Sequence, residues 1–413
     1  MMLLIGGGTE AVPGIERVRA MGLRIAVVDG DPGAPGFALA DHALVLSTYD
    51  IEGVVDAARN LHDETPIHGV MSIACDVPRT VAAIAQALNL PGIPPATAAL
   101  CMDKLAMKER FVQTGVPVPW FDALHSGDQL AKAIASQERV IIKPVDSRGS
   151  RGVLLVSQEQ DPDWAFEQAR AASPTGRVMM EQFLDGPQLS TESVVLEGRV
   201  FTLGCSDRNY ARLHEFTPHV IEDGGCQPTA HLDDVLPSVD SVIARAAQAI
   251  GMSRGVLKGD LVLVPGRGPV VIEVAPRLSG GWFSTDQIPV STGVDLVQMQ
   301  ARIALGETPE AAEMTPARWD PIAVRYAFPG NGHLKDIQGI ENLAKEPWCH
   351  RVHVFAQPGD HLTSPDNHTG RAAVVLATGA TRREAIERAK DGVARLKFNF
   401  EKQSQARPKT AAA

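Results

Sequence analysis

The chain has 413 residues, 44% of them hydrophobic, and its 39 Lys and Arg against 49 Asp and Glu give a formal net charge of -10. This length suits about two to four folded domains, and the apolar content excludes a wholly disordered chain. The acidic balance argues against nucleic acid as a main partner, because a basic surface is needed to neutralise a phosphate backbone.

The sequence carries no signal for a membrane or for export. No stretch reaches the roughly 18 consecutive apolar residues of a membrane helix, and the start, MMLLIGGGTE, lacks the basic region and cleavage site of a signal peptide. The 5 cysteines are scattered without a Cys-x-x-Cys pair, which favours a reducing compartment. We therefore expect a cytoplasmic protein with no membrane partner.

Short apolar runs alternate with helical patterns in the first hundred residues. Strands are predicted at 3–5, 24–28 and 68–73, and helices at 15–21, 54–60 and 80–88. This alternation is typical of βαβ units that build a parallel sheet. We expect a Rossmann-like first domain over residues 1–99.

A glycine-rich turn follows the first predicted strand. Residues 6–11 read Gly-Gly-Gly-Thr-Glu-Ala and open a helix, and Asp29 ends the second strand. The pattern matches a dinucleotide-binding turn, whose backbone N–H groups approach a pyrophosphate. It leaves an NAD-dependent oxidoreductase as one alternative. We favour a turn without a dinucleotide, because a better nucleotide-binding pattern lies downstream.

The rest of the chain is richer in strands. A helix at 104–113 ends at the stop signal Gly-Val-Pro-Val-Pro. Strands are then predicted at 140–143, 153–156, 178–183, 189–196, 199–204, 259–264 and 269–274, helices at 164–172, 239–250 and 382–395, and a polar loop at 206–231. We expect a small α+β subdomain over 100–190, a larger one over 191–310, an α+β extension over 311–400 and a tail over 401–413.

The loop after Lys143 has the composition of a phosphate-binding loop. It contains Ser147, Arg148, Gly149, Ser150 and Gly152. Small residues let backbone amides surround phosphate oxygens, and a lysine at a strand end supplies a point charge. The order of a Walker loop is absent. A plain hairpin loop between two strands is the alternative.

Two acids interrupt the apolar strand pair at 259–274. Asp260 and Glu273 would face each other on adjacent antiparallel strands, an oxygen pair suited to Mg²⁺ or Mn²⁺. Acids on interior strands are costly without a partner, which favours a metal role over a structural one. Arg277 follows on a turn whose N–H groups we expect to meet an anionic substrate; the turn residues are Ser279, Gly280 and Gly281.

A charged and aromatic loop lies where we expect the substrate side. Its residues Arg208, Tyr210 and His214 are expected to affect substrate choice before ATP affinity, although a solvated connector explains the loop equally well. Lys258, two residues before Asp260, is a further cation expected in the same cleft.

Taken together, these segments resemble the ATP-grasp superfamily of carboxylate-amine ligases. The shared features are the helix lysine before Gly-Val-Pro-Val-Pro, the Lys-Pro-Val-Asp-Ser-Arg-Gly-Ser-Arg-Gly-Val loop, Glu-Gln-Phe-Leu-Asp-Gly and Glu-Val-Ala-Pro-Arg-Leu-Ser-Gly-Gly, in that order. The remainder resembles the extension of carbamoyl phosphate synthetase, purine-pathway ligases and L-amino-acid ligases. The resemblance implies an α/β and α+β multidomain ATP-grasp fold behind a Rossmann-like domain.

The resemblance also implies roles for single residues. Lys104 and Lys143 would contact the ATP phosphates under a lid formed by residues 147–152, and Asp260 and Glu273 would bind Mg²⁺. The remaining nucleotide contacts would come from Glu181, Gln182, Phe183 and Leu184 at the adenine and from Gln188 or Glu192 at the ribose. Ala275 stands where many members have a metal-binding Asn, which argues against two-metal coordination.

The implied activity is an ATP- and Mg²⁺-dependent ligation. A carboxylate would become an acyl phosphate, with Arg277 and Lys143 as catalytic cations, and an amine would displace phosphate. A purine-type carboxylation or formyl transfer and, from another class, a noncatalytic ATP-binding protein remain alternatives. No ribose-phosphate signature stands out, so we favour an amino acid or related amine as acceptor. A homodimer is the default assembly, because it is the commonest one.

Overall fold

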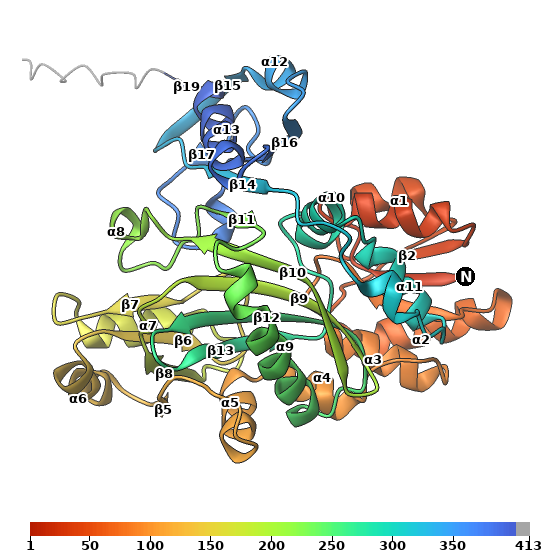
Figure 1. The fold of residues 1–413 in the computed structure, drawn as a ribbon, viewed down its shortest axis with the longest axis horizontal. Coiled ribbons are helices and arrows are strands. Elements are labelled where there is room, and N and C mark those ends of the chain that lie inside the picture. Colours follow the sequence, from red (N-terminus) through yellow and green to blue (C-terminus); the bar gives the residue numbers. More distant parts are fainter. Residues whose placement is uncertain (402–413) are drawn as a thin grey trace, which may run out of the picture.

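The computed structural model describes residues 1–401, and these residues build four β-sheets. Figure 1 shows the N-terminal sheet in red and the small sheet in yellow on opposite sides of the large sheet in green, with the C-terminal strands in blue. The tail expected at 401–413 lies, from Lys402 on, outside the described residues. No helix among residues 1–401 combines the length and the apolar character needed to cross a membrane.

The N-terminal sheet is parallel and has the strand order β3-β2-β1-β4. Its strands are β1 (Met2–Ile5), β2 (Ile25–Asp29), β3 (His42–Val45) and β4 (Gly69–Ser72), and its helices are α1 (Val12–Ala20), α2 (Ile51–Glu64) and α3 (Pro78–Ala87). Strand β1 is buried along its whole length, as a parallel strand covered on both faces must be. The sequence analysis missed β3, whose residues are all at least partly exposed.

The small sheet has the order β5-β8-β6-β7 and is antiparallel. Its strands are β5 (Phe121–Leu124), β6 (Val140–Pro144), β7 (Leu154–Val156) and β8 (Val178–Gln182), accompanied by α4 (Pro95–Cys101), α5 (Lys104–Gln113), α6 (Gly127–Gln137) and α7 (Pro162–Ala171). Helix α5 is confirmed with its predicted bounds, because Asp103 caps its start and Gly115 follows its end at φ 73°. The analysis missed α4, β5 and α6.

The large sheet has eight strands in the order β13-β12-β9-β10-β11-β14-β18-β16. They are β9 (Gln188–Leu196), β10 (Arg199–Asn209), β11 (Gly224–Gln227), β12 (Arg254–Val264), β13 (Gly268–Ala275), β14 (Ile322–Ala327), β16 (Cys349–Val354) and β18 (Ala373–Thr378). The polar loop predicted at 206–231 is wrong, since it contains the end of β10, the short helix α8 (Leu213–Phe216) and β11. The strand residues in this segment are mostly polar or glycine, so pairing with neighbouring strands, not an apolar pattern, makes them part of the sheet.

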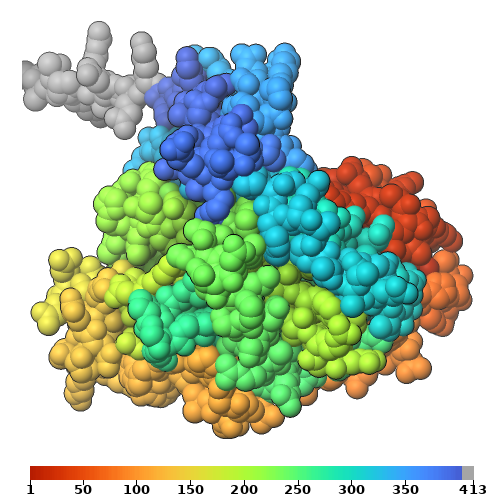
Figure 2. Space-filling model, viewed as in Figure 1, coloured from red at the N-terminus to blue at the C-terminus, as the bar shows by residue number. Residues whose placement is uncertain are grey.

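The remaining elements surround the large sheet. They are η1 (Pro35–Leu39), α9 (Leu232–Ala249), the π-helix η2 (Phe283–Gln287), α10 (Ile288–Thr292), α11 (Leu296–Ala304), η3 (Ala311–Met314), β15 (Gly332–Gln338), α12 (Ile340–Ala344), β17 (His361–Leu362), η4 (His368–Gly370), α13 (Arg382–Arg395) and β19 (Lys397–Phe400). In the space-filling view the C-terminal residues, in blue, sit on segments coloured green and cyan (Figure 2).

The units share their cores rather than standing apart. Leu4 of β1 packs in the same apolar cluster as Val194 of β9 and Leu296 of α11. Strand β14 pairs with β11, so the large sheet runs across the boundary expected at residue 310. The domain boundaries stay predictions. The fold positions one cleft where the N-terminal unit, the small sheet and the large sheet meet.

Candidate active site

A cleft of about 720 Å³ lies between these units, a size typical of small-molecule sites. It receives residues from elements far apart in the chain. Most of the residues predicted from the sequence line it: Lys104, Lys143, Ser147, Arg148, Gly149, Ser150, Glu181, Gln182, Phe183, Leu184, Gln188, Arg208, Tyr210, Lys258, Asp260, Glu273, Arg277, Ser279, Gly280 and Gly281. The structure therefore brings together a set that the sequence spreads from Lys104 to Gly281.

The floor of the cleft holds two lysines on one carboxylate. Lys143 Nζ lies 2.5 Å from Glu181 Oε1 on the neighbouring strand β8, and Lys108 Nζ lies 2.8 Å from Glu181 Oε2. Burial lowers the pKa of Lys108 to about 8, against the opposing pull of Glu181. Burial favours a neutral Glu181, but Lys108 and Lys143 hold its pKa below the usual range. Sequence analysis missed Lys108, although its position one helical turn after Lys104 places both on one face of α5.

Lys104 connects the predicted lid to the predicted metal site. Its ammonium donates to the backbone oxygen of Ser147 at 2.6 Å and lies 3.7 Å from Glu273 Oε2. Asp103, the residue that caps α5, also pairs with Arg177 at 2.5 Å. The start of α5 is therefore fixed on two sides, and Lys104 projects from it into the cleft.

The predicted lid, residues 147–152, contacts three other parts of the chain. Ser150 donates to the Val220 oxygen at 2.8 Å, the N–H of His368 donates to the Gly149 oxygen at 3.0 Å, and the Arg148 guanidinium lies 4.1 Å from the centre of the Tyr49 ring. Gly149 and Ser150 both have positive φ values, 64° and 60°, which bend the loop sharply.

Gly152 corrects one prediction, because it does not line the cleft. A side chain there would meet the Ala172 Cβ at 2.6 Å and Pro144 at 3.0 Å, and its φ is +69°. The glycine is required for close packing against α7 and β6, not for contact with phosphate. Sequence alone does not separate these two reasons for a glycine.

The residues predicted to bind adenine and ribose lie at the end of β8 and in the loop that follows it. Gln182, Phe183, Leu184 and Gln188 line the cleft, and the Arg139 guanidinium lies 4.5 Å from the centre of the Phe183 ring. Glu192 is a correction: it is fully buried and accepts hydrogen bonds from the Ser279 N–H at 2.7 Å and from the Ser284 hydroxyl. It supports the turn behind the cleft and is not available to a ribose.

Asp260 and Glu273 stand opposite each other on β12 and β13, as the strand pairing predicts, with a bulge directly after Asp260. The Lys258 ammonium contacts Asp260 and lies 4.0 Å from Glu273 Oε1. Burial alone would raise the pKa of Glu273, but Lys104 and Lys258 hold it far below its usual range. Both carboxylates are therefore held charged by cations of the chain itself.

The residues fit a magnesium ion held partly by its substrate. Within residues 1–401 no group of three or more His, Cys, Asp or Glu side chains forms a complete protein cage. Mg²⁺ is commonly bound by one or two carboxylates together with phosphate oxygens and water. Asp260 and Glu273 match that donor set, whereas Ala275 adds no ligand.

The turn after β13 places Arg277 at the edge of the cleft. Its Nε lies 3.2 Å from Asp76 Oδ1 in the N-terminal unit. Burial lowers the pKa of Arg277 and the Asp76 carboxylate raises it, and the net effect is a rise. The guanidinium therefore stays charged. The expectation of free N–H groups is wrong at Ser279 and Gly281, because they donate to Glu192 and to Glu10, each at 2.7 Å.

The predicted substrate side is only partly correct. Arg208 donates to Glu222 at 2.9 and 2.7 Å and lies 3.2 Å from Asp260, and Tyr210 lines the cleft beside it. His214 is exposed on α8 and lies outside the cleft, which Leu213 lines in its place. Helical geometry turns adjacent side chains in different directions, so the loop reaches the cleft through Leu213 and not through His214.

The N-terminal glycine turn is occupied by its own chain. The Gly7 N–H donates to Asp29 Oδ2 at 2.7 Å, and the Gly7 oxygen accepts from the Gly36 N–H at 2.8 Å. Asp29 thus binds the backbone donor that a pyrophosphate would need. Three residues after Gly7, the Glu10 carboxylate accepts from the Gly281 N–H, so the turn supports the cleft.

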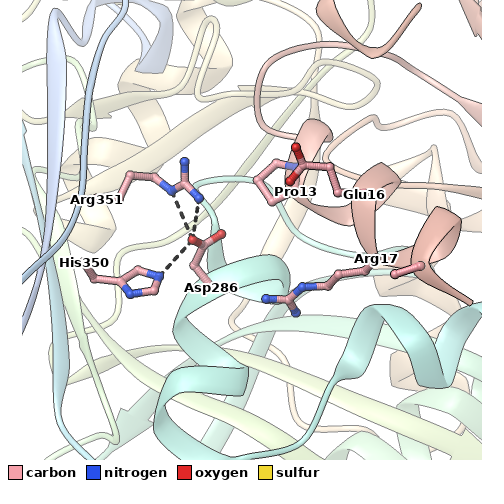
Figure 3. A pocket seen from close by; sticks show the side chains of 7 residues that line it. Pro13, Glu16, Arg17, Asp286, His350 and Arg351 are labelled. Carbon is pink, nitrogen blue, oxygen red and sulfur yellow. Dashed lines mark hydrogen bonds and ion pairs between the residues drawn. The ribbon is translucent and has the colours of Figure 1, made fainter. Parts of the chain in front are cut away.

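A second hollow, of about 420 Å³, lies behind the turn that follows β13. Figure 3 shows His350 and Arg351 of β16 approaching Asp286 from one side, with Pro13 and Glu16 of α1 on the other. Asp286 Oδ1 lies 3.0 Å from His350 Nε2 and 2.7 Å from Arg351 Nη2. This contact joins the C-terminal strands to the π-helix η2, whose Phe283 lines the main cleft.

These features define the class of protein. Residues 101–281 match the ATP-grasp domain, residues 15–92 the ATP-grasp N-terminal domain, and residues 325–401 the L-amino acid ligase C-terminal domain 2. The chain belongs to the ATP-grasp superfamily of carboxylate-amine ligases, which use ATP, and it has the mixed α/β multidomain fold expected of that superfamily.

Individual relatives are distant but match along the whole chain. The chain is 27% identical over 416 residues to a formate-dependent phosphoribosylglycinamide formyltransferase of Burkholderia pseudomallei (strain 1106a), covering 96% of this chain and 95% of the relative. It is 25% identical over 393 residues, 92% of this chain and 79% of the relative, to the uncharacterized protein y4rH of Sinorhizobium fredii (strain NBRC 101917 / NGR234).

Solved structures share the fold. The L-amino acid ligase from Bacillus licheniformis superposes with a TM-score of 0.82 at 23% identity, over 97% of this chain and 98% of that one. The phosphoribosylglycinamide synthetase from Anaerococcus prevotii gives a TM-score of 0.74 at 17% identity, over 97% and 99%.

Proposed function

We propose that this protein is an ATP- and Mg²⁺-dependent ligase that joins a small-molecule carboxylate to the amino group of an amino acid or related amine. The observation that carries the proposal is the convergence of Lys143, Glu273 and Arg277 on one cleft, from two different sheets and a turn. Such a site needs no nucleophilic side chain, because positioning and charge neutralisation are what phosphoryl transfer requires.

In the first step a carboxylate oxygen attacks the γ-phosphorus of ATP, the bond to the β-phosphate oxygen breaks, and ADP leaves. Lys104, at the start of α5, and Lys143, on β6, neutralise the charge of the phosphates. Mg²⁺, held by Asp260 and Glu273, would supply further charge neutralisation at the phosphates. Arg277 faces the charge that develops on the acyl phosphate.

In the second step the amine nitrogen attacks the carbonyl carbon. The bond between that carbon and the phosphate oxygen breaks, the nitrogen gives up a proton, and phosphate leaves as hydrogen phosphate carrying that proton. Arg277 stabilises the oxyanion of the tetrahedral intermediate, because its charge is held in place by Asp76. The closed lid keeps water from hydrolysing the acyl phosphate.

ADP release measured with pairs of carboxylates and amino acids tests this proposal. We expect ADP and phosphate in equal amounts with an amide product, and loss of turnover in Lys143→Met and Glu273→Gln. Exposed Lys132 and Glu159 provide matched controls, Lys132→Met and Glu159→Gln. Full activity in the cleft variants would contradict the site, and ATP binding without turnover on any pair would favour a noncatalytic nucleotide-binding protein.

A purine-type reaction is the second candidate, and the 27% identity to a formate-dependent formyltransferase over nearly the whole chain favours it. Formate with phosphoribosylglycinamide, added to the same assay, decides between the two. The match of residues 325–401 to the C-terminal domain of L-amino acid ligases supports the first candidate. A homodimer remains a prediction, which sedimentation of the full chain tests.

A further inference from the structure

The C-terminal strands contribute a polar wall to the cleft that none of the predicted roles uses. Tyr326 of β14, His368 of η4 and Arg371, the residue just after η4, line the cleft. We call these three residues, together with Arg208 and Glu222, the C-terminal subsite. Sequence analysis treated their segment only as an appended strand and helix unit.

Arg371 is held in a fixed orientation. Its guanidinium centre lies 3.6 Å from the centre of the Tyr326 ring, and Nη2 donates to the Glu222 backbone oxygen at 3.0 Å. Its side chain is 14% exposed, and its Nε is buried with no hydrogen-bond partner in the described part of the chain. A buried donor without a partner is costly, which points to a ligand that accepts from it.

His368 presents a second unused polar atom. Its backbone N–H is taken by the Gly149 oxygen of the lid, whereas its ring nitrogen Nε2 is buried and, within residues 1–401, makes no hydrogen bond. Burial, with the nearby cations Arg371 and Arg208, keeps the pKa of His368 well below its usual range. The ring is therefore neutral at physiological pH and offers one donor or one acceptor.

The C-terminal subsite adjoins the point of acyl transfer. A side chain at Gly281 would come within 2.9 Å of the Tyr326 hydroxyl, so Tyr326 lies against the turn that carries Arg277. On its other side, Glu222 accepts from Arg208, whose Nη1 lies 3.2 Å from Asp260. A molecule bound by Arg371 would reach the reacting carbonyl with its other end.

We propose that the C-terminal subsite binds the carboxylate of an amino acid whose amino group attacks the acyl phosphate; this rests on the proposed function. Arg208 and Arg371 face Glu222 at 2.7 and 4.0 Å, and Arg208 and Lys258 also contact Asp260, so three cations meet two carboxylates. One positive charge is thus in excess, which matches a carboxylate better than a dianionic phosphate ester. The forked guanidinium also suits the two oxygens of a carboxylate.

Binding measurements test the subsite apart from catalysis. The full chain saturated with MgADP is titrated calorimetrically with each of the twenty common L-amino acids, and then with the carboxamide of each one that binds. We expect the amide to bind about 10- to 100-fold more weakly than the acid, the usual effect of losing a hydrogen bond to a charged group. In Arg371→Gln this difference in affinity between acid and amide should disappear. ATP affinity should stay unchanged, because the contact to the predicted lid is made by the backbone of His368, which this substitution leaves in place.

Two further variants keep the test decisive. Arg371→Lys retains the positive charge without the forked guanidinium and should give an intermediate preference for the acid over the amide. Exposed Arg383 on α13 provides the control Arg383→Gln. Unfolding in urea shows whether each variant is folded. Equal affinity for acid and amide in the wild type, or a preference that survives in Arg371→Gln, overturns the subsite. Displacement of the amino acid by equimolar inorganic phosphate overturns the choice of carboxylate.

The same preparation separates this inference from the proposed function. If no pair of acid and amine releases ADP, the ligase proposal fails. The acid-to-amide difference in binding still confirms or refutes the subsite, because it needs no turnover. If turnover occurs, Arg371→Gln should raise the KM of the amino acid by about the same 10- to 100-fold, leaving the KM of the carboxylate substrate unchanged.

Discussion

Lys108 and Glu181 form a fully buried ion pair, with Lys108 Nζ 2.8 Å from Glu181 Oε2 and the other oxygen of Glu181 on Lys143. The side chain of Lys108 has no exposure, whereas Lys143 has 5% and faces the cleft. Lys108 therefore acts on the nucleotide site only through Glu181. It is a positioning residue beneath a predicted catalytic one.

Replacement of Lys108 by Met should destabilise the protein and weaken ATP binding. The change leaves the Glu181 carboxylate buried with one partner instead of two, and breaking a buried pair costs about 3 to 5 kcal/mol. Urea unfolding measures the loss in free energy of unfolding. The double variant Lys108→Met, Glu181→Gln should recover part of this loss. A free energy of unfolding within about 0.5 kcal/mol of wild type would contradict the role given to this pair.

Replacement of Glu192 by Gln should change how stability depends on pH. Burial, against hydrogen bonds from Ser284 and Ser279, raises the pKa of Glu192 from 4.5 to about 7. Between these values the folded state binds more protons than the unfolded one, so the contribution of Glu192 to stability falls as pH rises from about 4.5 to 7 and is constant above. Over this pH range the contribution of Glu192 to the free energy of unfolding falls by about 3 kcal/mol in total.

Thermal or urea unfolding of both proteins between pH 4 and 8 checks this expectation. The stability of Glu192→Gln relative to wild type should rise across that window and level off above it. Glu159→Gln, at an exposed position, serves as control. Parallel stability curves for wild type and Glu192→Gln would show that Glu192 titrates at an ordinary pH.

Replacement of Glu273 by Gln should lower the rate of ADP release about 100-fold or more, because the transferring phosphoryl group loses charge stabilisation through its metal. Asp260→Asn should act in the same direction. The Mg²⁺ concentration that gives half-maximal rate should rise in both variants. An unchanged Mg²⁺ dependence would place the metal elsewhere.

The two ends of the predicted substrate loop should respond differently. His214→Ala should change no KM by more than about twofold, because the side chain is exposed and outside the cleft. Arg208→Gln removes the cation that contacts both Glu222 and Asp260. Because Arg208 belongs to the C-terminal subsite, the KM of the amino acid should rise about 10-fold. A larger effect of His214→Ala than of Arg208→Gln would reverse this order.

Local patterns were enough to predict the bounds of α5 and the pairing of Asp260 with Glu273. Asp103 and Gly115 delimit α5, and the turn after β12 sets the register that puts Asp260 opposite Glu273. In both cases the determining residues lie within about fifteen positions of each other, so short-range geometry decides the outcome. Gly152 and His214 were wrong for a related reason, since a pattern names a loop but not the direction in which each residue faces.

The sequence by itself determined the superfamily and the strands that carry Lys143, Asp260 and Glu273. Only the tertiary structure decided which buried charges share a partner: Lys108 with Glu181, Glu192 with Ser279, and Arg371 with Tyr326. These partners are 45 to 87 residues apart. Burial makes such contacts strong, but no periodicity encodes them, because they depend on how separate sheets and the C-terminal strands close around one cleft.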